Sequence, residues 1–145
     1  KHNDTIKRLA EKLAAVDFTS DIQAKDFVDS LAGYELDFFD NIQTRYFLDY
    51  RPEHVGAADL ENAQENIKFF SQIGLTEEYD RFVNRFCRDF HLPPQEGLQR
   101  ANTADRYQLF DCSKDAALSP LHKLIEFDRH LYRHVSESFW SGKGK

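Results

Sequence analysis

Two histidines and a glutamate lie at helical spacing near the end of the sequence. Glu126, His130 and His134 follow one another at intervals of four residues, which on a helix brings their side chains to one face. Imidazole and carboxylate groups in such a row can ligate Zn²⁺. The same segment also carries Asp128 and Arg129, a mixture of charges typical of a solvated helix face. We favour the solvated face and predict no metal site.

Carboxylates recur in an earlier segment of the chain. Asp37, Asp40 and Asp49 could in principle exchange protons as general acids and bases. Charges in such a run more often belong to a solvated helix face. The sequence contains no glycine-rich loop followed by Lys-Ser/Thr, no Gly-x-Ser-x-Gly elbow and no His-Glu-x-x-His pair. We therefore predict no catalytic residue in this chain.

Composition limits the class of protein. The 145 residues include 25 acidic and 19 basic side chains, which gives a formal net charge of −6. This balance argues against a nucleic-acid-binding protein, because contacts to the phosphate backbone require an excess of Lys and Arg. Hydrophobic residues make up 41% of the chain and aromatic residues 14%, too many for a disordered segment. No apolar run approaches the roughly 20 residues of a membrane-spanning helix, so we expect a soluble globular domain.

Methionine and cysteine usage adds two expectations. The sequence contains no Met, so we expect Lys1 to be an internal or processed position and not a translation start. The two cysteines, Cys87 and Cys112, have the spacing of no zinc motif. We expect both to be reduced, with Cys87 in the hydrophobic core.

Apolar residues recur three and four positions apart along most of the chain, which is the period of an amphipathic helix. No segment shows the strict alternation of a β-strand. The pattern predicts a mainly α fold of about six helices, in a single domain over residues 1–141 with a flexible tail at 142–145. Side chains expected in the core include Ile22, Tyr46 and Phe70. The expected helices cover residues 6–16, 20–32, 34–50, 57–72, 76–90 and 119–139.

Local signals place the ends of these helices. Pro52 ends the third helix, because the residue before a proline disfavours the helical basin. Thr76 is predicted to be an N-cap, with two glutamates in the first turn after it. Ser119 and Pro120 are predicted to be the N-cap and first residue of the last helix. Residues 91–118 are expected to form a long irregular loop, which in a compact domain is more often functional than not.

Three segments stand out from this background. They read Asn41-Ile42-Gln43-Thr44-Arg45-Tyr46-Phe47, then Ala63–Phe70 continuing into Ile73-Gly74-Leu75-Thr76-Glu77-Glu78, and finally Phe127-Asp128-Arg129-His130-Leu131-Tyr132. In this order they resemble the C-terminal half of the sulfotransferases that use 3′-phosphoadenosine 5′-phosphosulfate. The branch with bacterial homologues and carbohydrate (uronyl) 2-O-sulfotransferases is the most similar. The resemblance covers about residues 20–140, and the Gly-Leu-Thr-Glu turn between two helices is its most specific part.

The resemblance implies that this chain is the helical C-terminal portion of a P-loop-like α/β sulfotransferase fold. In that family a loop after the first strand binds the 5′-phosphosulfate, and a later Arg and Ser hold the 3′-phosphate. Both would lie N-terminal to Lys1. Sulfuryl transfer to a hydroxyl needs that anion-binding loop and a base on the acceptor. We therefore expect the isolated chain to be inactive and its partner to be the missing N-terminal half of the same fold.

The resemblance also implies a nucleotide-binding role for the loop that follows Pro93, which in this family folds across the nucleotide. Here the loop contains Gln99, Arg100, Asn102 and Thr103. The guanidinium of Arg100 is a planar donor suited to a phosphate. Asn102 and Thr103 offer short polar groups for an adenine edge or a phosphate oxygen. These four residues are the predicted cofactor-binding set, and an ordinary polar loop is the alternative.

A polar notch lies in the first of the three segments. Asn41 and Arg45 are neighbours at i and i+4 on a helix, with Thr44 beside them. By resemblance the three could line the cleft for the acceptor substrate. The alternative is a buried Arg45 paired with a carboxylate, and we favour that structural role slightly.

Other interpretations of the chain remain open at this point. It could be a stand-alone helical protein-interaction module without catalytic activity, with exposed aromatics that bind a protein partner or a second copy. It could also be a helical regulatory or toxin-associated protein. Hydroxyls of sugars, lipids, small metabolites and tyrosine all fit as acceptors. A bacterial family member would be cytoplasmic, and an animal one would face the Golgi lumen.

Overall fold

The computed structural model describes residues 2–95 and 115–140, and this part of the chain is helical without any strand. The mainly α prediction is therefore confirmed. The predicted tail at 142–145 lies outside the described residues. None of the described helices is both long and apolar enough to span a membrane. The elements are α1 (His2–Ala14), α2 (Asp21–Ser30), 3₁₀ helix η1 (Gly33–Phe38), α3 (Ile42–Tyr46), α4 (Ala57–Ile67), 3₁₀ helix η2 (Thr76–Glu78), α5 (Tyr79–Asp89), α6 (Asp115–His122), α7 (Glu126–Val135) and π-helix η3 (Ser136–Trp140).

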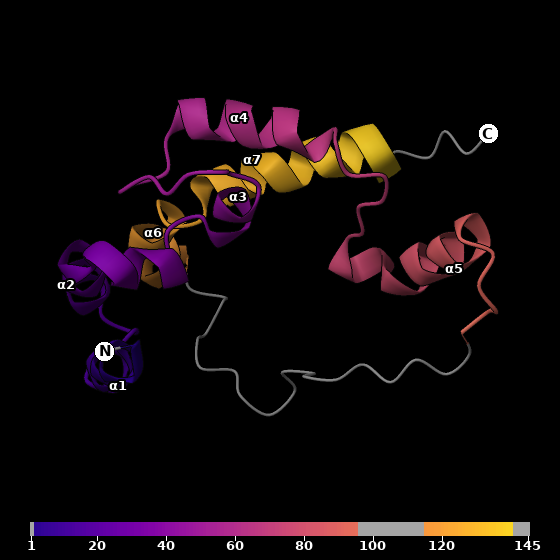
Figure 1. The fold of residues 1–145 in the computed structure, drawn as a ribbon. Helices are drawn as coiled ribbons and strands as arrows, with labels where there is room; N and C mark the ends of the chain where they lie inside the picture. The colour runs from indigo at the N-terminus through magenta and orange to yellow at the C-terminus, as the bar shows by residue number, and fades with distance from the viewer. Residues whose placement is uncertain (1, 96–114, 141–145) are drawn as a thin grey trace.

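Helix α7 is the central element of one set of packed helices. It packs against α4 and α3, while α2 packs against α6. Figure 1 shows α4 running alongside α7, α2 and α6 together toward the N-terminal end, and α5 beyond the other end of α7. Because α6 leads directly into α7, these contacts connect the two ends of the described chain.

Two clusters of buried side chains form the core. The first joins α1, α2, η1 and the turn after α6, and its buried members are Leu9, Phe27, Val28, Leu31, Leu36 and Leu124. The second joins α4 to α7 and η3, and its buried members are Ala63, Ile67, Leu131, Val135 and Trp140. Cys87 is a buried free thiol, as predicted, and Cys112 lies outside the described residues. The core is thus held mainly by aliphatic and aromatic side chains at helical spacing.

Several predicted core positions are exposed in the structure, Ile22, Tyr46 and Phe70 among them. Ile22 exposes 73% of its surface, Tyr46 80% and Phe70 50%. Ile22 lies two residues before the buried Ala24 and Tyr46 two residues after the buried Thr44. Two helical steps of about 100° place each of them on the opposite side of its helix. Phe70 lies just beyond the end of α4, where the helical periodicity no longer applies.

The helix predicted over residues 34–50 is broken in two. The 3₁₀ helix η1 ends at Phe38, and the five-residue α3 begins only at Ile42. Between them Asn41 has a φ of 49° and a ψ of 54°, the left-handed conformation that cannot continue an α-helix. Asn is among the few non-glycine residues that adopt this conformation readily.

Two predicted helix starts are also wrong. Thr76 is the first residue of η2 and makes no capping hydrogen bond, and the N-cap position of η2 belongs to Leu75. Ser119 and Pro120 lie inside α6, which begins at Asp115. Pro120 supplies no N–H to the helix, and α6 ends two residues after it. By contrast the start predicted at residue 20 agrees with the structure, where Ser20 is the N-cap of α2 and accepts a hydrogen bond from Gln23 N–H at 3.4 Å.

The turn between α4 and η2 has room for no side chain at Gly74. A Cβ atom at this position would lie 2.6 Å from Cγ and 2.8 Å from Cδ2 of the Phe82 ring. Phe82 belongs to α5 and packs against the second core cluster. The approach of the Gly74 backbone therefore seats α5 on the rest of the molecule.

We expect Gly74→Ala to lower the free energy of unfolding by about 1–3 kcal/mol, because the Phe82 ring must shift within a packed cluster. Urea denaturation measures the change. Gly56→Ala is the matched control, since its added Cβ would meet nothing closer than Asp59 Oδ2 at 3.7 Å. Equal stability of the two variants would contradict the close approach of Gly74 to Phe82.

Candidate functional site

Asn41 is the first residue of the first segment that resembles the sulfotransferases, and it is completely buried. Its Oδ1 accepts hydrogen bonds from the N–H groups of Phe127 at 2.7 Å and Asp128 at 3.1 Å. Its Nδ2 donates to Asp40 Oδ1 at 2.8 Å and to the carbonyl of Lys123 at 3.3 Å. Two donors and two acceptor positions are all that a side-chain amide has. The Asn41 amide is therefore fully used by the protein.

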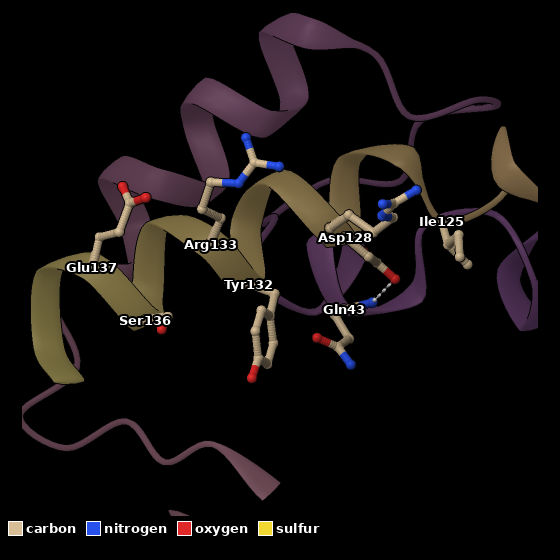
Figure 2. Close-up of a pocket in the computed structure, with 8 residues that line it drawn as sticks. Gln43, Ile125, Asp128, Tyr132, Arg133, Ser136 and Glu137 are labelled. Atoms are coloured by element: carbon tan, nitrogen blue, oxygen red, sulfur yellow. Dashed lines mark hydrogen bonds between the residues drawn. The ribbon is translucent and has the colours of Figure 1, made fainter. Parts of the chain in front are cut away.

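Asp128, in the third segment, forms hydrogen bonds with the start of α3. Its carboxylate accepts hydrogen bonds from the N–H groups of Gln43 at 3.1 Å and Thr44 at 2.7 Å, and from the Thr44 hydroxyl at 2.8 Å. Figure 2 shows the Asp128 carboxylate turned toward the backbone at Gln43, with a dashed line on that bond. These N–H groups belong to the first turn of α3, where no partner within the helix exists. A carboxylate is favoured there by the positive end of the helix dipole.

The two helices thus cap each other. Asn41 immediately precedes α3 but caps the first turn of α7, and Asp128 lies in the first turn of α7 but caps α3. This reciprocal cap also explains why α7 begins where it does. The chain turns at residues 123–125, and α7 restarts where Asn41 satisfies its free N–H groups. The helix predicted over 119–139 is broken at that turn.

Tyr132 connects the remaining segment to this unit. Its hydroxyl donates a hydrogen bond to Glu77 Oε2 at 3.2 Å, and Glu77 follows the Gly-Leu-Thr turn directly. Partial desolvation raises the pKa of the Tyr132 phenol above its ordinary value, and the Glu77 carboxylate raises it further. Tyr132 is therefore protonated at neutral pH and acts here as a donor, so all three segments meet around α7.

Arg45 is a buried guanidinium held by several acceptors. Its Nη2 lies 2.6 Å from Asp40 Oδ2, and its Nε donates to the carbonyl of Asp40 at 2.7 Å. It also donates to the carbonyls of Pro52 and Glu53 at 2.7 and 3.0 Å. Asp40 Oδ2 in turn accepts the N–H of Val55 at 3.0 Å. The structural alternative proposed for Arg45, pairing with a carboxylate, is present in the structure.

The three predicted substrate-binding residues therefore lie together but have protein partners. Asn41 and Thr44 are fully buried, and the Arg45 side chain keeps 11% of its surface exposed. Their contact with an acceptor stays a prediction. The four predicted nucleotide-binding residues, Gln99, Arg100, Asn102 and Thr103, lie outside the described residues.

Metal and acid–base candidates find no support among the described residues. No group of three or more His, Cys, Asp or Glu side chains in this part of the chain could hold a metal ion, and this includes Glu126, His130 and His134. Asp37 forms an ion pair with Arg51, and Asp40 is committed to Arg45. These two carboxylates serve as ion-pair partners within the fold.

A groove of about 540 Å³ runs along the outer face of α7. Figure 2 shows Tyr132 and Gln43 extending to one side of the helix and Arg133 to the other. Sequence reasoning missed this groove and treated its charges as an ordinary solvated face. The signal was the pair Arg129 and Arg133, one helical turn apart. Its lining residues are Gln43, Ile125, Asp128, Arg129, Tyr132, Arg133, Ser136 and Glu137.

No family model, no curated protein and no solved structure matches this chain.

Proposed function

We propose that this chain is the C-terminal helical portion of a sulfotransferase. The complete enzyme would move a sulfuryl group from 3′-phosphoadenosine 5′-phosphosulfate to a hydroxyl acceptor. One observation carries the proposal. The three segments that resemble the family are joined by side-chain hydrogen bonds across 84 to 87 residues between the first and third, and 55 residues between the second and third. The three segments therefore form one structural unit. A chance resemblance would give no reason for such segments to contact one another.

The described residues would serve this enzyme as a scaffold. Asn41, Asp128 and Arg45 have protein partners for their polar groups, so none of them is available as an acid, a base or a sulfate ligand. The phosphosulfate-binding loop and the acceptor base would come from the half of the fold N-terminal to Lys1. Accordingly we expect no sulfuryl transfer by the 145-residue chain alone, because positioned anion donors supply most of the catalysis in such a displacement.

The test begins with the reading frame upstream of Lys1. The proposal requires a strand, a loop with a Lys-Ser/Thr or Lys-Thr-Gly pattern and a helix within about 150 residues, the arrangement that cradles phosphate groups. The protein encoded by the complete frame is then titrated with adenosine 3′,5′-bisphosphate. Saturable binding supports the proposal. A frame that lacks the loop, or a complete protein that does not bind the nucleotide, contradicts it.

Arg100→Ala tests the predicted nucleotide loop in the same complete protein. We expect a loss of about tenfold or more in affinity for adenosine 3′,5′-bisphosphate, as for a charge-assisted hydrogen bond to phosphate. Arg88→Ala is the matched control, because the Arg88 side chain is 75% exposed at the far end of α5. Unchanged affinity in Arg100→Ala would remove Arg100 from the site and leave the rest of the proposal standing.

A second candidate function, a protein-interaction module, is favoured by a different observation. Phe69 exposes 86% of its surface, and Tyr46 exposes 80%. Aromatic side chains are enriched at protein interfaces. If the upstream frame contains no phosphate-binding loop, this function takes precedence. Phe69→Ser together with Tyr46→Ser would then be expected to abolish self-association or partner binding without loss of fold.

A further inference from the structure

Two arginines on α7 stand apart from the other cationic side chains of the molecule. Among the described residues, neither Arg129 nor Arg133 makes a hydrogen bond or an ion pair with a carboxylate. Every other described lysine and arginine except Arg8 has such a carboxylate partner. In a chain with a net charge of −6, where acidic partners are abundant, Arg129 and Arg133 are two neighbouring guanidinium groups, one helical turn apart, that no described carboxylate pairs with.

The surface around these arginines is hollowed on both sides. Arg129 and Arg133 line the groove of about 540 Å³ described above and also a second hollow of about 390 Å³. They therefore form the ridge between two concave surfaces. The second hollow is lined by both basic and acidic side chains, namely His122, Lys123, Glu126, Arg129, His130 and Arg133.

Three carboxylates near the arginines are held by other partners, while Glu137 lines the groove and Glu126 lines the second hollow. Asp128 lines the groove, but its carboxylate accepts three hydrogen bonds from the start of α3. Glu77 accepts a hydrogen bond from the Tyr132 hydroxyl. Lys123 pairs with Asp29 at 2.6 Å, and hydrogen bonds from Lys123 and Lys25 lower the pKa of Asp29 to about 2. Asp128, Glu77 and Asp29 are thus engaged elsewhere, and no described carboxylate pairs with Arg129 or Arg133. Both guanidinium groups are therefore open to an external anion.

We propose that Arg129 and Arg133 form a binding site for a tetrahedral oxyanion, the phosphate or sulfate group of an organic ester. Guanidinium groups are planar, permanently charged donors whose fork matches two oxygens of such a group. Residues four apart on a helix are about 5–6 Å apart at Cβ, so two long arginine side chains can converge on one anion. This site does not depend on the sulfotransferase proposal, because its two arginines belong to α7 and need no residue outside this chain.

Apolar surface beside the arginines favours an ester over the free ion. Ile125 and Tyr132 are 43% and 41% exposed, and both line the groove with the arginines. Figure 2 places the Tyr132 ring on one rim of the groove and Ile125 at the end near the start of α7. The organic body of an ester can cover these two side chains while its oxyanion lies between the guanidinium groups.

The test titrates the 145-residue chain with inorganic phosphate and, separately, with phenyl phosphate at constant ionic strength. Binding is followed by the ¹⁵N–¹H resonances of the arginine Nε groups. We expect saturable shifts confined to Arg129 and Arg133, with phenyl phosphate bound several-fold more tightly than phosphate. The double variant Arg129→Gln/Arg133→Gln should lose at least tenfold in affinity for phenyl phosphate. Arg8→Gln removes an equally unpaired arginine from α1 and should bind as the parent chain does.

Three results would decide against parts of this inference. Shifts that sodium chloride reproduces at equal ionic strength, or an equal loss of affinity in Arg8→Gln, would overturn the site as general attraction of anions. Equal affinities for phosphate and phenyl phosphate would leave an oxyanion site but overturn the ester as its ligand. Thermal unfolding followed by circular dichroism checks that the double variant is folded, as the exposure of both arginines leads us to expect.

Discussion

Replacing Asn41 by alanine is expected to lower the free energy of unfolding by about 4 kcal/mol. The substitution leaves the N–H groups of Phe127 and Asp128 without their acceptor, and it removes the Asn41 donor from Asp40 Oδ1 and from the carbonyl of Lys123. Each unsatisfied buried polar group costs roughly 1–3 kcal/mol. Alanine at a φ of 49° adds about 1 kcal/mol of backbone strain.

Two further variants separate these contributions. Asn41→Gly removes the same hydrogen bonds but adopts the left-handed conformation freely, so it should be about 1 kcal/mol more stable than Asn41→Ala. Asn62→Ala is the surface control. Asn62 is exposed and donates only to the Tyr50 hydroxyl at 3.1 Å, and its loss should change stability by less than about 0.5 kcal/mol.

Urea denaturation of the three variants gives the free energies, and the far-ultraviolet circular dichroism of the folded states reports on the helices. A cost below about 1.5 kcal/mol for Asn41→Ala would contradict the reciprocal cap of α3 and α7, since a single exposed helix cap already contributes about that much. A cost as large as 4 kcal/mol is a substantial part of the 5–15 kcal/mol that stabilises an ordinary domain. We therefore expect Asn41→Ala to be close to unfolding at 37 °C.

Helical periodicity predicted the class of the fold well, and it failed where a distant contact decides the local structure. The apolar spacing from Leu36 to Phe47 is that of one helix, yet the chain breaks it at Asn41. The cause lies more than 80 residues away in the start of α7. The apolar pattern around Asn41 does not contain that information. The one local signal for the break was the residue type, because Asn is among the few non-glycine residues that tolerate positive φ.

Predicted caps failed for a related reason. Thr76 has the residue type and the following glutamates of an N-cap, but the chain enters η2 one residue earlier and α5 only at Tyr79. Meanwhile the first turns of α3 and α7 obtain their caps from each other. Rules for capping describe a residue and its own helix, and they do not anticipate a cap donated by another element.

The sequence identified the segments of the candidate site but not the hydrogen bonds that join them. The resemblance singled out the segments containing Asn41, Asp128 and Tyr132, and hydrogen bonds join all three. What each residue does came only from the structure. The charge balance of α7 was likewise visible in the sequence. The sequence could not show that Arg129 and Arg133 are unpaired, because this depends on which residues the neighbouring carboxylates bind in the fold.

Arg45→Ala is the second substitution with a large expected effect, about 3–5 kcal/mol of lost stability. The Asp40 side chain is only 6% exposed and would lose its ion-pair partner at 2.6 Å, which leaves an uncompensated buried charge. The carbonyls of Pro52 and Glu53 would also lose their donors, so the segment before α4 should loosen. Arg51→Ala is the matched control. Arg51 is 47% exposed in its ion pair with Asp37, and such surface pairs contribute at most about 1 kcal/mol.

A double-mutant cycle distinguishes the ion pair from the packing of the arginine stem. Arg45→Met keeps most of the apolar stem and removes the charge, while Asp40→Asn removes the opposite charge and keeps an oxygen for the Val55 N–H. Replacing both partners is less costly than breaking the pair, because no lone charge is then buried. We expect the double variant to be more stable than the sum of the single effects predicts, by about 1–3 kcal/mol. Additive effects in urea denaturation would mean that Arg45 stabilises the 47–56 segment through its backbone contacts alone, and that the pairing with Asp40 contributes nothing to the fold.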